Sequence, residues 1–80
     1  MKDKTITLTV ETGKGPITMD FEKTIKVVEA AKKAAAEKGY PDGNYVFVHN
    51  GGQMQPERPL VSYHLEDGAK VVLSATGDNY

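Results

Sequence analysis

The side chains that could carry out chemistry in this sequence are few, and they do not converge. Ser62 and His64 stand two residues apart, but no carboxylate is clearly placed to orient them as a nucleophile and base. His49 and His64 are the two histidines, and without cysteine they form a poor set of metal ligands. The glycines in residues 13–15 and 51–52 are too few and too poorly spaced to cradle a phosphate. We therefore expect no enzyme, no metal site and no cofactor, with both histidines at the surface.

The composition describes one small domain and excludes several classes of protein. The chain has 80 residues, no cysteine, and 10 Lys+Arg against 11 Asp+Glu, for a net charge of −1. Without cysteine there can be no disulfide, cysteine-based zinc site or thiol nucleophile. No basic block is present to grip nucleic acid, no apolar run approaches the roughly 20 residues of a membrane span, and the start lacks a signal-peptide core. These features favour a cytoplasmic protein, expected to be a monomer, that binds neither nucleic acid nor membrane.

Two alternating segments near the N-terminus predict a β-hairpin. Residues 5–10 and 17–21 each alternate apolar and polar side chains, on either side of a glycine-containing turn. Alternation in a strand sends successive side chains to opposite faces, so each segment has one face suited to a core. The side chains expected to face that core are Ile6, Leu8, Val10, Ile17, Met19 and Phe21.

A single helix is expected over residues 25–38, where strong helix formers dominate. Thr24 is suited to cap its N-terminus, because a threonine hydroxyl can accept from free backbone amides. Gly39 is the expected residue of positive φ at its end, and Pro41 prevents continuation. The residues expected on its buried face are Ile25, Val28, Ala31 and Ala35.

The second half of the chain predicts three further short strands. Residues 45–49 form the densest run of β-formers, residues 50–52 are a strong hairpin turn, and residues 53–54 can add only a very short strand. Residues 60–65 are compact but too short for a full helix, and residues 69–73 read as a closing strand. Hairpin, helix and three short strands indicate an α+β roll. We expect the domain to cover residues 1–74, with residues 75–80 as a flexible tail.

This order of elements resembles the β-grasp fold of the ubiquitin family over residues 4–74. Residues 10–14 ahead of 17–19 look like the first hairpin of ubiquitin, 24–28 like its helix start, and 47–51 like its third strand and turn. The strongest match is Leu60-Val61-Ser62-Tyr63-His64-Leu65, which fits the family's Leu-x-x-Tyr-x-Ile/Leu segment and is followed by Asp67-Gly68-Ala69. The resemblance implies a ubiquitin-like β-grasp roll. It also places the Tyr63 ring under a loop, with its hydroxyl bonded to the backbone.

The tail departs from the family pattern, in which modifiers end in Gly-Gly. This sequence ends Ser74-Ala75-Thr76-Gly77-Asp78-Asn79-Tyr80. Gly77 could become the terminus after a protease removes the last three residues. The resemblance then implies a bacterial protein modifier with an E1-like activating enzyme, an E2-like conjugating enzyme, a JAB-type protease and target proteins as partners. A non-covalent binding module or small subunit of a larger complex, and a sulfur carrier that also needs a bare glycine end, stay open as alternatives.

Three valines are candidates for a partner-binding face. If Phe47 points to the core, Val46 and Val48 must point outward, and if Val71 points inward, Val72 points outward. In ubiquitin an apolar patch on the outer sheet face binds most partners; Val48 and Val72 match two of its positions, and Ser74 replaces the third. We expect Val46, Val48 and Val72 to form a docking face smaller than that of ubiquitin.

Overall fold

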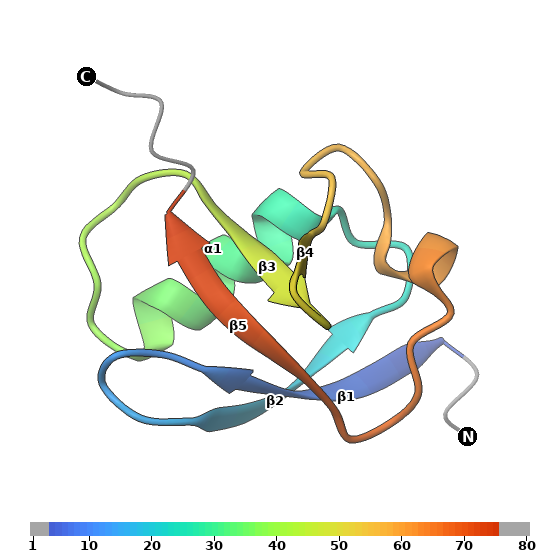
Figure 1. The fold of residues 1–80 in the computed structure, drawn as a ribbon, viewed down its shortest axis with the longest axis horizontal. Coiled ribbons are helices and arrows are strands. Elements are labelled where there is room, and N and C mark those ends of the chain that lie inside the picture. Colours follow the sequence, from blue (N-terminus) through green and yellow to red (C-terminus); the bar gives the residue numbers. More distant parts are fainter. Residues whose placement is uncertain (1–3, 76–80) are drawn as a thin grey trace.

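A five-stranded mixed sheet curves around one helix in the computed structural model, which describes residues 4–75 (Figure 1). The strands lie in the order β2-β1-β5-β3-β4. The elements are β1 (Thr5–Glu11), β2 (Ile17–Glu22), α1 (Val27–Glu37), β3 (Tyr45–His49), β4 (Gly52–Gln53), the 3₁₀ helix η1 (Leu60–Tyr63) and β5 (Ala69–Ala75).

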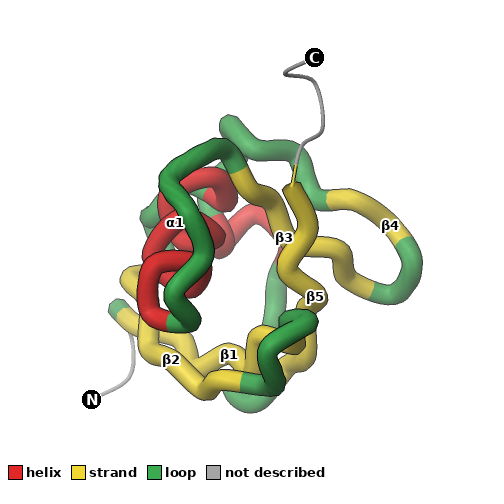
Figure 2. Tube along the Cα trace, turned by 90° about the vertical axis from the view of Figure 1, so that its left-hand side faces the viewer, coloured by secondary structure: helices red, strands yellow, loops and turns green. Residues whose placement is uncertain are grey.

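The first and last strands of the sequence, β1 and β5, pair in parallel in the middle of the sheet, and β2 and β4 form its edges. β1 pairs with β2 antiparallel and with β5 parallel, while β3 pairs with β5 and β4 antiparallel. Figure 2 shows α1 on one side of the sheet, and among the described elements no α-helix lies on the other face. This arrangement is the predicted ubiquitin-like β-grasp roll.

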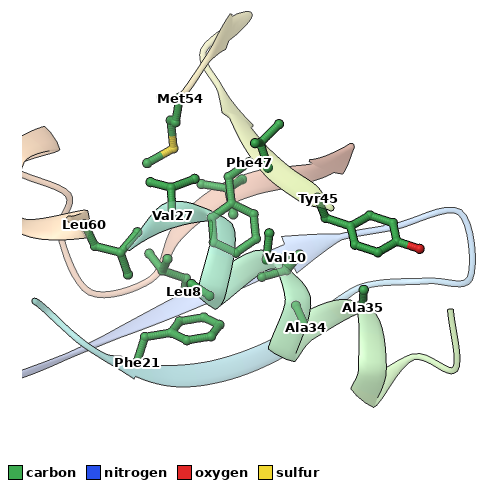
Figure 3. Packing of buried hydrophobic residues seen from close by; sticks show 14 of the residues in the cluster. Leu8, Val10, Phe21, Val27, Ala34, Ala35, Tyr45, Phe47, Met54 and Leu60 are labelled. Atoms are coloured by element: carbon green, nitrogen blue, oxygen red, sulfur yellow. The ribbon is translucent and has the colours of Figure 1, made fainter. Parts of the chain in front are cut away.

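The core lies between α1 and the sheet, and the alternation in the sequence predicted most of its strand residues. Ile6, Leu8 and Val10 are buried, and in β2 the inward series ends in buried Phe21 (Figure 3). Phe47 of β3 is fully buried and meets the Phe21 ring, with their centroids 6.1 Å apart in a tilted arrangement. The predicted hairpin and its core-facing side are therefore confirmed.

The helix begins two residues later than predicted, and Thr24 does not cap it. No side chain caps the N-terminus of α1. Instead the Val27 N–H donates to the Arg58 carbonyl at 2.9 Å, and the next N–H donates to the Pro56 carbonyl at 3.1 Å. The loop after β4 thus supplies backbone acceptors for amides that a helix start leaves unpaired. A local sequence pattern cannot reveal acceptors that come from about 30 residues away.

The later start also changes which helical residues face the core. Ala31 and Ala35 are buried as predicted, but Val28 and Ile25 are only partly buried. The buried stripe follows the spacing i, i+3, i+4, i+7, i+8 from the first helical residue. Its members are Val27, Ala30, Ala31, Ala34 and Ala35. Four alanines allow α1 to lie close to the sheet.

The predicted ends of the helix and of the β3–β4 turn are confirmed by their backbone angles. Gly39 has φ of 83°, its N–H donates to the Ala36 carbonyl, and the Tyr40 N–H donates to the Ala35 carbonyl. These two bonds satisfy carbonyls that a helix end leaves free. Asn50 turns β3 into β4 with φ of 54°, followed by a glycine that is also left-handed.

The segment after β4 folds as the resemblance implies. Leu60 begins the 3₁₀ helix η1 and is buried. The Gln55 N–H donates to the Tyr63 hydroxyl at 2.6 Å, so the tyrosine ties η1 to the loop that precedes it. Leu65, on the other side of Tyr63, packs partly buried against the core.

Replacing Tyr63 with phenylalanine should lower the free energy of unfolding by about 1 kcal/mol. The ring keeps its packing, and the loss is that of one short backbone-to-hydroxyl hydrogen bond. Urea unfolding followed by circular dichroism measures the difference. Tyr40→Phe is the matched control, because no hydrogen bond of its hydroxyl is found among residues 4–75. Equal losses in the two variants would contradict the assignment.

Candidate functional site

Two valines form an exposed pair on the sheet face that α1 leaves open. Val48 of β3 lies directly opposite Val72 of β5 in the antiparallel register. Val72 is 46% exposed, and Val48 is partly exposed. Directly opposed residues hold their Cβ atoms about 5 Å apart, so the two side chains form one apolar surface. The predicted outward direction of both residues is confirmed.

Val46 was expected to extend this surface, and that expectation is wrong. Its register partner is Ser74, which puts it on the same strand face as Val48, yet Val46 is fully buried. Val46 belongs to the buried cluster that also contains Tyr45 and Phe47, its two neighbours in β3. A strand on each side does not by itself bury a residue of β3, because Val48 lies between β5 and β4 and is still partly exposed. Alternation therefore predicts the face of the strand on which a side chain lies, but not how much of that side chain is exposed.

Charged and polar residues surround the valine pair. Glu11 of β1 is the parallel register partner of Val72 and is exposed. Lys70, two residues before Val72 on the same strand, is exposed as well, and Ser74 is partly exposed. The pair is therefore a small apolar centre with a charge of each sign beside it, a composition suited to a protein contact with a polar rim.

The part of this face formed by β1 and β2 is polar and internally paired. The Thr7 hydroxyl donates to Asp20 at 2.5 Å, and the hydroxyl oxygens of Thr9 and Thr18 are 3.4 Å apart. These side chains satisfy one another across the strands. The exposed apolar surface on this face is thus restricted to β3 and β5.

The strand that carries Val72 also leads to the tail. β5 continues through Ala75, one residue beyond the predicted domain boundary. Gly77, the predicted processing and conjugation residue, follows two residues later and lies outside the described residues. Val72 is therefore only five residues from Gly77 along the chain.

The histidines come near one another without forming a metal site. His49 and His64 line one open hollow of about 390 Å³, together with Glu66 and Asp67. Asp67 is already engaged, because its carboxylate accepts from the Thr7 N–H at 3.0 Å. Within residues 4–75, no three His, Asp or Glu side chains are placed to hold a metal ion.

The possible Ser62–His64 pairing is not formed. The Ser62 hydroxyl donates to the Pro59 carbonyl at 2.8 Å, which closes the turn of η1. His64 follows η1 with its side chain exposed. The serine therefore has a structural partner and not a base.

Sequence reasoning missed one surface residue, Val61. It is 47% exposed, and a pocket of about 260 Å³ opens beside it. The period of a 3₁₀ helix could have predicted this exposure. Residues three apart lie on the same side of such a helix, so when Leu60 and Tyr63 face the core, Val61 faces away from it. Reading residues 60–65 only as a compact hydrophobic segment hid this difference.

The described part of the chain has no helix of the length and apolar character that a membrane span requires.

Comparison with known proteins gives one family and many similar folds. The model of the family described as "Ubiquitin family" matches residues 6–76. No curated protein matches the sequence.

Solved structures resemble the fold at low sequence identity. A protein designed on the basis of ubiquitin has a TM-score of 0.80 and 19% identity, covering 98% of this chain and 96% of its own. A chain from a structure described as molecular mimicry of SUMO that promotes DNA repair has a TM-score of 0.81 and 20% identity, and the match covers 89% of this chain and 91% of the other. The ubiquitin-like domain of an Arabidopsis thaliana protein has a TM-score of 0.75 and 18% identity, and the match covers 96% of this chain and 83% of the other. At these identities the likeness shows the fold alone.

Proposed function

Because this chain belongs to the ubiquitin family, we propose that it is a protein modifier, trimmed after Gly77 and conjugated to target proteins through that glycine. The observation that carries the proposal is the combination on one strand: β5 bears the exposed Val72 and leads, two residues after its end, to Gly77. An enzyme that engages the tail would meet Val72 on the same strand and Val48 on the neighbouring strand β3.

The proposed chemistry needs only a carboxylate from this chain. A JAB-type protease hydrolyses the bond after Gly77 and releases the last three residues. An E1-like enzyme transfers AMP from ATP to the new carboxylate and releases pyrophosphate, and the thiolate of its cysteine then displaces AMP to form a thioester. The thioester passes to the cysteine of the E2-like enzyme. A lysine amine of the target finally attacks the thioester carbonyl, forms an amide bond and releases the E2 thiol. The thiols belong to the enzymes, which agrees with a chain that has no cysteine.

Glycine suits the reacting position for a steric reason. Without a Cβ it passes through a narrow channel and leaves its carbonyl carbon open to attack. Ala75 and Thr76, which precede it, are also small.

The test is the intact mass of the chain expressed together with the activating enzyme, the conjugating enzyme and the protease. We expect the mass of residues 78–80 to be lost and heavier adducts with target proteins to form. A chain that keeps Tyr80 and forms no adduct under these conditions would refute the modifier function.

The valine pair supports one further candidate, a non-covalent protein-binding module. Val48 and Val72 lie entirely within β3 and β5, so a partner could bind them without any processing of the tail. This candidate predicts a reversible complex with the full-length chain and no change in mass. A sulfur carrier would be distinguished by a trimmed chain in which one oxygen of the terminal carboxylate is replaced by sulfur.

Val72→Asp should slow transfer to the conjugating enzyme by about tenfold without unfolding the chain. An aspartate in the apolar contact would lose water without gaining a partner, whereas a substitution at a position 46% exposed changes stability little. Single-turnover transfer assays with purified enzymes measure the rate. Thr9→Asp, on the polar half of the same face, is the control. If both variants transfer at the same reduced rate, the valine pair has no special role.

A further inference from the structure

A pocket beside η1 shares no lining residue with the valine pair. It has a volume of about 260 Å³. Its floor is apolar, since Ile6 and Leu60 are buried core residues and Leu65 is partly buried. The complete lining is Ile6, Lys23, Leu60, Val61, His64 and Leu65.

Val61, at this pocket, is one of two large hydrophobic residues with an exposed side chain among residues 4–75. Its backbone is firmly held, because its N–H donates to the Lys23 carbonyl at 2.9 Å, yet its side chain is 47% exposed. The position would accept a polar residue without loss to the core. An aliphatic side chain that is held rigid at the mouth of an apolar pocket offers surface that a bound group can cover.

His64 is the second residue that the end of η1 places at the pocket. It is the residue that ends this 3₁₀ helix, with φ of 55° in the left-handed region, where histidine and asparagine are among the enriched residues. The same histidine contributes to the rim of the pocket.

None of the residues that line this pocket is a carboxylate, although Glu66 and Asp67 line the neighbouring hollow to which His64 also belongs. Among the residues that line the pocket, Lys23 and His64 are the ionisable ones. Both can donate hydrogen bonds, and the lysine is positively charged. A ligand that complements this pocket presents an aliphatic group to the floor and a carboxylate to the rim.

We propose that this pocket binds a segment of a partner protein in which an aliphatic residue lies next to acidic residues. The aliphatic side chain lies on Ile6, Leu60 and Val61. The carboxylates lie against Lys23 and His64. This interaction is independent of the tail and of conjugation.

The direct test titrates the full isotope-labelled chain with a blocked peptide of sequence Gly-Leu-Asp-Asp-Gly. Saturable shifts of the amide resonances of Val61, His64 and Lys23 are expected. A peptide with serine in place of leucine, and one with lysines in place of the aspartates, should both bind at least about tenfold more weakly. Absence of saturable shifts, or equal binding of the lysine peptide, would overturn the proposal.

Two variants test separately the apolar contact at Val61 and the charged contact at Lys23. Val61→Ser should weaken binding of the leucine peptide by about tenfold through lost apolar contact, and Lys23→Glu should weaken it in a salt-dependent way. Val72→Ser is the matched control, since that valine is exposed to nearly the same extent, at 46% against 47%. Its affinity for the peptide should equal that of the unaltered chain. Equal losses in Val61→Ser and Val72→Ser would reject the pocket.

His64→Asn separates binding from stability. Asparagine tolerates the left-handed conformation better, so the melting temperature should rise while the affinity for the peptide falls. A structural role alone would raise the melting temperature and leave the affinity unchanged, which would remove His64 from the proposed contact.

Self-association and the tail are tested separately from peptide binding. Shifts of the pocket resonances with protein concentration, in the absence of peptide, would show that a second copy of the chain is the occupant and would overturn the proposal. A chain with glutamate at position 77 should still bind the peptide, so failure of the modifier function and failure of this pocket are distinguishable.

Discussion

Gly77→Glu should abolish every covalent adduct of this chain in cells that contain the activating and conjugating enzymes. A long, charged side chain at the terminal residue would have to enter a channel suited to glycine and would crowd the carbonyl carbon at each transfer. The loss should exceed about a thousandfold, because activation and transfer both pass through this residue. Immunoblots for heavier species and intact mass spectrometry measure the result. Gly77→Ala, with a single added methyl group, should leave a small fraction of the adducts.

The matched control for this variant is Gly52→Ala in β4. A Cβ at that position would meet its nearest neighbour, the His49 carbonyl oxygen, at 3.7 Å, an ordinary van der Waals distance, so the fold accepts it. Adduct formation by the Gly52→Ala chain should match that of the unaltered chain. Adducts that persist undiminished in Gly77→Glu would place the attachment elsewhere in the chain and contradict the proposed function.

Phe47→Ala should lower the free energy of unfolding by about 3–5 kcal/mol, the largest effect on stability that we expect from one side chain. Phe47 is fully buried in the central part of the sheet and contacts Phe21. A domain of this length has a total stability of roughly 4–12 kcal/mol. The variant should therefore be close to unfolded at 37 °C, as measured by urea and thermal denaturation.

The neighbouring residue provides the comparison for Phe47. Val48 faces the open side of the sheet and is partly exposed, so Val48→Ala should cost about 1 kcal/mol or less. Because the two residues are adjacent in β3, a general weakening of the strand would affect both. Similar losses in the two variants would show that the core is not centred on Phe47.

The sequence patterns predicted the elements well where the relevant information is local. Strict alternation identified the buried faces of β1 and β2, and Gly39 marked the end of α1. The helix start was wrong because its amides bond to Pro56 and Arg58, which are distant in the sequence. Local patterns describe a side chain's direction, but remote backbone partners decide where a helix begins.

The candidate site was predictable only in part, for a similar reason. Alternation correctly predicted that Val48 and Val72 point outward, and the strand register of the structure shows that they lie opposite each other. Alternation could not show that Val46 is buried, or that Val61 lies beside a pocket. Exposure depends on what surrounds a position in three dimensions. Gly77 stays a prediction, because it follows the described residues.

The central position of β5 affects how this chain folds as it is synthesised. The strand is made last but lies between β1 and β3, and the Asp67 carboxylate just before it bonds to the Thr7 amide, 60 residues earlier. Contacts of such large sequence separation form late and slow folding. On the ribosome, β1 and β3 have no strand between them until β5 emerges, so the sheet cannot be completed during most of translation. An enzyme that needs both the face of β5 and the residues after it would therefore select finished molecules over partly folded ones.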